Sequence, residues 1–161
     1  DHMLAPKVAG RILQALAIQP TDQALEIGTG SGYLTAGLAA SARNVRSLEI
    51  RADLAAKATQ NLSAVGVRNA TVEHRDAYAS EALGNTAYDV IVLTGSLPIA
   101  DARYERQLAI GGRLFAVIGQ GAVMEATLIE RISAEQYRRP VLFETSLKAL
   151  IGAAHPARFT F

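Results

Sequence analysis

Residues 26–32 read Glu-Ile-Gly-Thr-Gly-Ser-Gly, and this stretch decides the fold. A short apolar run, 23–27, leads into it, and a segment rich in Ala and Leu, 31–42, follows it. Glycines at alternate positions let the backbone turn sharply and let a ligand approach without meeting a Cβ atom, and the helix start behind them offers free N–H groups. The order of strand, glycine loop and helix therefore predicts an α/β fold with a nucleotide-type cofactor at the loop.

The spacing of the glycines indicates which cofactor. Gly28, Gly30 and Gly32 follow the acid Glu26 as G-x-G-x-G, whereas dinucleotide-binding loops read G-x-G-x-x-G. A carboxylate at the end of the first strand repels phosphate and attracts a cation, and the sulfonium and amino groups of S-adenosylmethionine are cationic. The loop thus favours S-adenosylmethionine, with S-adenosylhomocysteine as product; a plain tight turn and a dinucleotide oxidoreductase are the alternatives.

Composition narrows the class of protein. The chain has 161 residues, half of them hydrophobic, with 16 Lys and Arg against 15 Asp and Glu, which predicts one domain over 1–161 and no nucleic-acid partner. No apolar run has the length of a membrane span, and the cytoplasm is the default location. The absence of cysteine and three scattered histidines predict no metal site. Residues 1–3 resemble an expression scar, which suggests that an N-terminal part of the natural protein is missing; the oligomeric state is not predicted.

Hydrophobic periodicity predicts alternating strands and helices. The expected helices cover 5–18, 31–42, 52–65 and 98–109, the last stopped by Gly111-Gly112, and the expected strands cover 23–27, 45–50, 70–74, 88–93 and 113–118. Two further strands, 122–132 and 141–147, flank a polar turn at 135–139 and suggest an antiparallel hairpin. This order predicts a Rossmann-like, doubly wound, mostly parallel sheet with antiparallel C-terminal edge strands, in which the fourth strand lies beside the first.

Acidic residues follow successive strands of this predicted sheet. In open α/β sheets, ligands bind at the carboxyl ends of the strands. Glu49 closes the second strand, where a carboxylate can accept both ribose hydroxyls, and Asp76 with Ala77 follows the third, where an acid and a backbone N–H can meet adenine. Ile50 or Tyr78 would cover the ring. Thr29 in the loop and Thr94 after the fourth strand complete the candidate cofactor residues.

The chain resembles the protein-L-isoaspartate O-methyltransferase family from about Leu4 to its C-terminus. The matching stretches are 25–33 (LEIGTGSGY), 76–77 (DA), 88–92 (YDVIV), 111–114 (GGRL) with Val117 and Gly119, and 157–161 (ARFTF), which is similar to the family's closing strand. The resemblance implies the class I methyltransferase fold and S-adenosylmethionine in the cleft. It also implies that the substrate is a protein or peptide bearing isoaspartate, whose carboxyl is methylated to an ester that starts repair to aspartate.

The chain departs from the family where the substrate is expected. The family's segment before the glycine loop reads I-S-x-P-H-x-H, with the Ser acting in catalysis; aligned on Pro6, it places Leu4 at the Ser and Lys7 at the first His. A leucine can neither donate a hydrogen bond to a carboxylate nor orient it. Lys7, Thr94 and Ser96 are the remaining candidates for contact with the substrate, although a solvated residue in a first helical turn is the simpler interpretation of Lys7.

Two classes of function therefore remain. The first is methyl transfer to a carboxylate, which is already a nucleophile and needs mainly alignment with the methyl group in a dry site. The second is a protein that keeps the cofactor but acts on another substrate or is not catalytic. A nucleic-acid base methyltransferase is disfavoured because no Asp/Asn-Pro-Pro-Tyr/Phe tetrapeptide follows the fourth strand.

Overall fold

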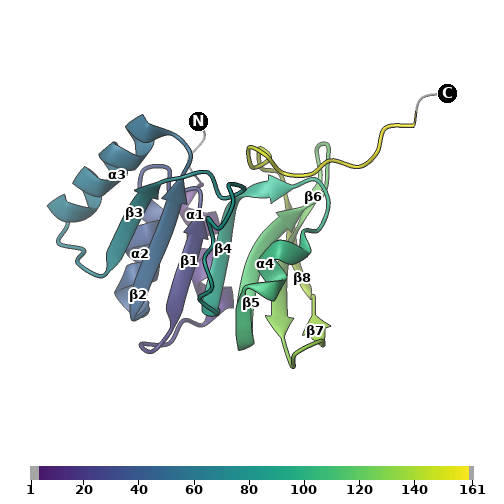
Figure 1. Cartoon of the computed structure of the whole chain (residues 1–161), viewed down its shortest axis with the longest axis horizontal. Helices are drawn as coiled ribbons and strands as arrows, with labels where there is room; N and C mark the ends of the chain where they lie inside the picture. The colour runs from purple at the N-terminus through teal and green to yellow at the C-terminus, as the bar shows by residue number, and fades with distance from the viewer. Residues whose placement is uncertain (1–3, 160–161) are drawn as a thin grey trace.

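A computed structural model describes residues 4–159 and builds them around an eight-stranded sheet (Figure 1). The sheet has the order β3-β2-β1-β4-β5-β6-β7, and β8 pairs with β6. The elements are α1 (Pro6–Leu16), β1 (Gln23–Ile27), α2 (Tyr33–Ser41), β2 (Asn44–Glu49), α3 (Ala52–Ala64), β3 (Ala70–His74), β4 (Tyr88–Leu97), α4 (Ala102–Arg106), β5 (Leu108–Ile118), β6 (Met124–Arg131), β7 (Tyr137–Arg138) and β8 (Val141–Thr145).

The predicted α/β sheet is confirmed. Strands β1 to β5 run parallel, with β1 between β2 and β4, so that Leu25 pairs with Arg46 on one side and with Ile91 on the other. Strand β6 runs antiparallel to β5, and β8 runs antiparallel to β6. The chain order reverses beside β1, where it leaves for β2 on one side and returns through β4 on the other. Ligands in such sheets bind at this point.

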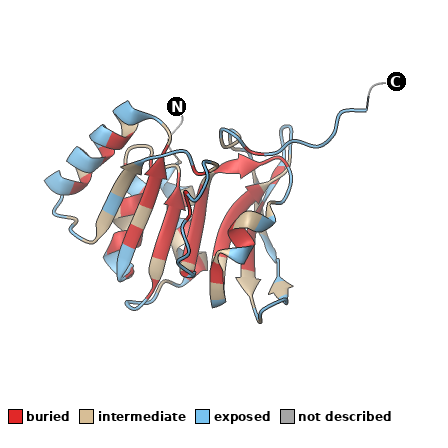
Figure 2. Cartoon of the chain, in the orientation of Figure 1, coloured by how far each residue is buried: buried red, intermediate tan, exposed pale blue. Residues whose placement is uncertain are grey.

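Each face of the sheet carries its own apolar core (Figure 2). On one face Ile12 and Leu16 of α1 and Leu38 of α2 pack against alternate residues of the central strands, and α3 contacts β2 and β3 beside them. On the other face the connection 75–87 and α4 provide the cover, with Tyr104 completely buried. Central strands covered on both faces are expected to read as continuous apolar runs, as β4 does.

The segment 98–118 differs from its prediction. The helix covers only Ala102–Arg106, β4 continues to Leu97, and β5 already begins at Leu108. Leu108 follows Tyr104 at helical spacing, but it pairs with Tyr88 of β4 and is buried as a strand residue. Gly111 and Gly112 do not stop a helix. They lie within β5 at a register shift, where Gly111 has a φ of +84° and a Cβ on Gly112 would lie 2.8 Å from the Ala109 carbonyl oxygen.

The C-terminal part of the structure also differs in some respects from its prediction. The predicted antiparallel strands are present, but the expected turn at 135–139 contains the short strand β7, which pairs with β6. Residues 157–159 form no strand, and Phe159 is 88% exposed, so the predicted closing strand is wrong for the part that is described. Residues 160 and 161, like the expected scar at 1–3, lie outside the described residues.

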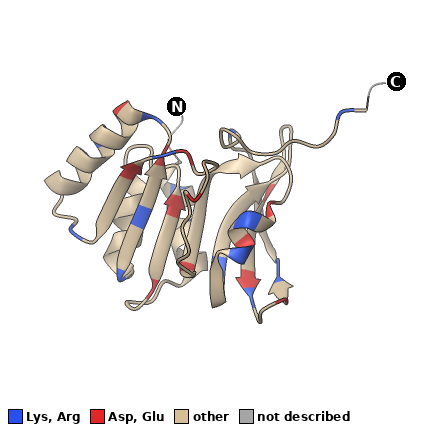
Figure 3. Ribbon diagram, viewed as in Figure 1, with Lys and Arg blue, Asp and Glu red and all other residues tan. Residues whose placement is uncertain are grey.

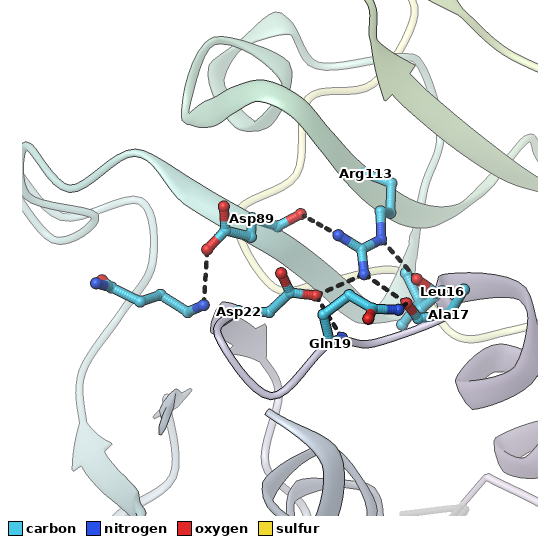
Figure 4. Close-up of polar contacts among 7 residues, drawn as sticks. Leu16, Ala17, Gln19, Asp22, Asp89 and Arg113 are labelled. Atoms are coloured by element: carbon cyan, nitrogen blue, oxygen red, sulfur yellow. Dashed lines mark hydrogen bonds and ion pairs between the residues drawn. The ribbon is translucent and has the colours of Figure 1, made fainter. Parts of the chain in front are cut away.

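Arg113 fastens the end of α1 to the amino ends of the central strands (Figure 4). Its guanidinium donates to the carbonyl oxygens of Leu16 and Ala17 and, at 2.6 Å, to the Asp22 carboxylate. The last carbonyls of a helix have no partner within it, so these bonds satisfy them and fix the helix against the sheet. Because α1 is thereby held at its C-terminus, the opposite end, with Leu4 and Lys7, takes a defined position.

Candidate functional site

The glycine loop has the backbone that its sequence predicts. Gly28, Gly30 and Gly32 have φ values of +94°, +55° and +87°, a region that side chains with a Cβ rarely adopt. The hydroxyl of Thr94 donates to the carbonyl oxygens of Ile27 and Gly28, at 3.0 and 2.6 Å, and a Cβ on Gly28 would collide with this hydroxyl. Thr94 therefore ties the end of β4 to the loop, and only glycine fits opposite it.

Glu26 lies beneath the loop rather than in a pocket. Its side chain is fully buried, and its Oε1 accepts hydrogen bonds from Thr35 at 2.5 Å and from Ser47 at 2.6 Å. Ser47 gives its proton to Glu26, so the 2.5 Å contact between the Ser47 and Thr29 hydroxyls has Thr29 as donor. Burial raises the pKa of Glu26 to about 7 from 4.5, against the lowering effect of the two hydroxyls. The sequence predicts that Glu26 attracts a bound cation directly, but its carboxyl is buried and does not reach the pocket surface. The side chain of Thr29 is likewise buried and turned inward.

Glu49 lines a pocket at the carboxyl end of β2. One carboxylate oxygen accepts from the N–H of Gly30 at 2.9 Å, and the other accepts from the N–H of Arg51 at 3.1 Å. These bonds fix the carboxylate beside Gly28 and Ile50, which line the same pocket. The structure thus brings Glu49 next to the glycine loop, although α2 and β2 separate the two in the sequence.

The next loop supplies the far side of this pocket. Asp76 and Ala77 line it, and Asp76 accepts from the N–H of Tyr78 at 2.8 Å, which holds the turn after β3. Tyr78 and Ile50, predicted as covers for a ring, both line the pocket. The guanidinium of Arg103 lies 4.7 Å from the Tyr78 ring centre and keeps that ring in place from α4.

Gly32 belongs to a different hollow. It forms the N-terminal end of α2, and with Tyr33, Leu62 and Val65 it lines a hollow between α2 and α3. A Cβ on Gly32 would lie 3.3 Å from the Leu62 side chain, so this glycine allows close packing of α3 rather than the approach of a ligand to the pocket at Glu49. Gly28 therefore lines the pocket, Gly30 donates its N–H to Glu49 in the pocket wall, and Gly32 allows close helix packing.

Five residues of the pocket were not predicted, and three of them, Ile27, Leu48 and Arg75, are sequence neighbours of predicted residues. Leu150 and Ile151 form part of its wall, although they stand more than 100 residues after the glycine loop. Their sequence context carries no recognisable motif, so only the path of the chain could reveal them. The pocket that they help to enclose has a volume of about 40 Å³, room for roughly three water molecules.

The predicted substrate-side residues are dispersed. Leu4 is half-buried and packs against the core beneath α1, and Lys7 is exposed in the first turn of α1. Ser96 is 1% exposed, and its hydroxyl donates to the carbonyl oxygen of Leu147 at 2.9 Å. The prediction that Ser96 faces the substrate is therefore wrong, because its hydroxyl is buried and already bonded. Thr94 directs its proton to the glycine loop.

Charges of both signs are spread over the described residues without a continuous field of one sign (Figure 3). Helix α4 carries Arg103 and Arg106, with Glu105 between them. Within residues 4–159, no helix is both long and apolar enough to cross a bilayer. In the same part of the chain, no group of three His, Cys, Asp or Glu side chains is arranged to hold a metal ion.

The sequence model of the protein-L-isoaspartate(D-aspartate) O-methyltransferase family matches residues 2–146. The chain belongs to this family. A protein-L-isoaspartate O-methyltransferase of Koribacter versatilis is 36% identical over 148 residues, which make up 91% of this chain and 65% of that protein. Another from a Synechococcus species is 40% identical over 115 residues, 71% of this chain and 47% of that protein.

Solved structures of the family share the fold. A crystal structure from Plasmodium falciparum, described as a candidate protein-L-isoaspartate O-methyltransferase in complex with S-adenosyl-L-homocysteine, superposes with a TM-score of 0.78 at 21% identity and covers 93% of this chain and 77% of that one. A second structure of a protein-L-isoaspartate O-methyltransferase gives a TM-score of 0.77 at 22% identity, over 90% of this chain and 47% of that one. The chain thus has the class I methyltransferase fold, and it spans about two thirds or less of the first curated relatives.

Proposed function

We propose that this family member binds S-adenosylmethionine in the pocket between Gly28, Glu49 and Asp76, and methylates the carboxylate of isoaspartyl residues in proteins. The observation that carries the proposal is the fixed carboxylate of Glu49. It is held at the pocket wall by two backbone N–H groups, one of them from the glycine loop. A carboxylate in such a position can accept both hydroxyls of a ribose, and the pair of oxygens gives the contact its direction.

The other pocket residues suit the rest of the cofactor. The turn after β3 offers Asp76 as acceptor for an adenine amino group, and the buried Ala77 leaves its side of the pocket narrow and apolar. Ile50 supplies aliphatic cover and Tyr78 an aromatic ring as cover for the adenine ring. Gly28 lines the pocket, and the absence of its Cβ makes room for the Thr94 hydroxyl that ties the loop to β4.

Methyl transfer asks little acid–base chemistry of this chain. When bound, S-adenosylmethionine supplies a methyl group from a sulfonium, whose sulfur keeps the electron pair of the bond that breaks. The substrate carboxylate donates the electron pair of the new O–C bond, so no proton has to move. The residues of the chain contribute by orienting the two partners and by excluding water.

A second function is favoured by one specific observation. Leu4, at the position of the family's Ser, is packed against the core of α1 and offers no hydrogen bond to a substrate. Lys7 is exposed one turn away and would be the cation nearest in sequence for a substrate carboxylate. A chain that binds the cofactor but methylates a different acceptor fits these two residues.

The test has two steps. Calorimetric titration with S-adenosylhomocysteine measures the pocket, and transfer of a radiolabelled methyl group to an isoaspartyl peptide measures the reaction, with the same peptide carrying normal aspartate as control. Binding and transfer only to the isoaspartyl peptide are expected. Binding without transfer would favour the second function, and absence of binding would refute the cofactor site. Leu4→Ser, which restores the family's hydroxyl, is expected to raise transfer without changing affinity for S-adenosylhomocysteine.

A further inference from the structure

The segment 147–153, here called the C-terminal strap, crosses the carboxyl edge of the sheet after β8 (Figure 1). It contains no helix and forms a single parallel bridge, between Ala149 and Ser96 at the end of β4. Leu150 and Ile151 of the strap line the cofactor pocket together with Glu49 and Asp76. The strap therefore forms part of the pocket wall.

Ser96 holds the strap with its backbone and its side chain. Its N–H donates to the Lys148 carbonyl, and its own carbonyl accepts from the N–H of Leu150, both at 2.9 Å. Its hydroxyl adds the bond to the Leu147 carbonyl, also at 2.9 Å. An alanine at this position could form the two backbone bonds but not the third.

Two glycines let the strap lie close to the rest of the protein. A Cβ on Gly95 would lie 2.7 Å from Cδ2 of Leu150 and 3.1 Å from its backbone nitrogen. A Cβ on Gly152, which has a φ of +89°, would lie 2.9 Å from the ring of Tyr78. The strap is thus fitted at one end to β4 and at the other to the aromatic ring of the pocket.

The fitted strap leaves little space. The pocket volume of about 40 Å³ suits a few water molecules, whereas ligand pockets usually measure several hundred Å³. Ile151 is 61% exposed, so its part of the strap is covered by no other element. A nucleoside can enter only if Leu150 and Ile151 move outward, and the bonds of Ser96 oppose that movement.

We propose that the C-terminal strap is the gate of the cofactor pocket and that Ser96 is the positioning residue that keeps it closed. The inference rests on the proposed function, because it takes the cofactor to occupy the pocket at Glu49. With the strap in place the pocket is too small for a nucleoside, so the contacts of Ser96 hold the closed state of the free protein and must be released on binding. Weakening them therefore raises the association rate and the affinity together, whereas loss of a residue of purely structural importance would not raise the affinity.

The experiment measures the association and dissociation rates of S-adenosylhomocysteine by stopped flow. In Ser96→Ala, loss of one hydrogen bond of the closed strap is expected to raise the association rate about fivefold and to lower Kd by a similar factor. In Gly95→Ala, the new Cβ meets the side chain and the backbone nitrogen of Leu150, so the association rate rises and Kd falls by more, on the order of tenfold. Hydrogen exchange at the Leu150 N–H is expected to quicken in both variants.

Matched controls remove the same groups away from the strap. Ser133→Ala deletes a hydroxyl that bonds only within its own turn, and Gly10→Ala adds a Cβ where no atom lies within 4 Å. Both are expected to keep the wild-type rates. Wild-type rates in both strap variants, or faster dissociation with a loss of affinity, would overturn the gate. If the wild-type protein does not bind S-adenosylhomocysteine at all, the proposed function fails and the gate falls with it.

Discussion

Glu26→Gln replaces the buried carboxyl beneath the glycine loop by an amide of the same shape. Burial raises the pKa of this carboxyl to about 7 from 4.5, so the folded protein holds its proton more tightly than the unfolded chain does. Below pH 4.5 the carboxyl is protonated in both the folded and the unfolded state, and its full contribution to stability is present. As the pH rises from 4.5 to above 7, the unfolded chain releases this proton before the folded protein does, so the free energy of unfolding falls.

The magnitude follows from the two pKa values. One pKa unit is worth about 1.4 kcal/mol, so the whole rise corresponds to about 3 kcal/mol of unfolding free energy, of which about 2 to 3 kcal/mol is lost between pH 5 and pH 8. The side chain is fully buried, so screening by solvent does not reduce this value. Glu26→Gln has no proton to lose, and its unfolding free energy should lack this part of the decline.

Urea denaturation of both proteins, followed by circular dichroism at several pH values, measures the difference. The expected result is that wild type loses about 2 to 3 kcal/mol more than Glu26→Gln between pH 5 and pH 8. Glu144→Gln, at an exposed position of β8, makes the same chemical change on the surface and serves as control. Parallel pH profiles for wild type and Glu26→Gln would refute the argument that burial controls this carboxyl.

Three further variants test the pocket and the frame around it. Glu49→Ala removes the carboxylate from the pocket wall and should weaken binding of S-adenosylhomocysteine about ten- to a hundredfold in calorimetry; unchanged affinity would place the ribose elsewhere. Gly28→Ala forces a Cβ into the Thr94 hydroxyl at a positive φ, so it should lower the unfolding free energy by about 2 kcal/mol and abolish binding. Arg113→Met removes the side-chain donor of the Leu16 carbonyl and the cationic partner of the buried Asp22 carboxylate, which keeps the Gln19 N–H, and should cost about 3 kcal/mol in urea denaturation. Arg138→Met, at a pair whose arginine is 71% exposed, should cost less than about 1 kcal/mol, and equal losses in the two arginine variants would contradict this interpretation.

The pattern of the sequence predicted most of the sheet because its signals are local. Continuous apolar runs such as 88–93 mark strands that are covered on both faces, and helical spacing marks α1 and α3. Local spacing failed at Leu108, which repeats at helical distance from Tyr104. Its pairing with Tyr88 in β4, not its own neighbours, makes it a strand residue.

The sequence by itself determined the glycine loop, because a positive φ at Gly28 and Gly30 is a property of single residues that a pattern of glycines reveals. It also placed Glu49 and Asp76 at strand ends, where parallel strands bring side chains to one edge. Only the tertiary structure decided that Glu26 is sealed beneath the loop and that Leu150 closes the pocket. Burial and enclosure depend on which distant segments pack together, and no neighbour in the sequence of either residue carries that information.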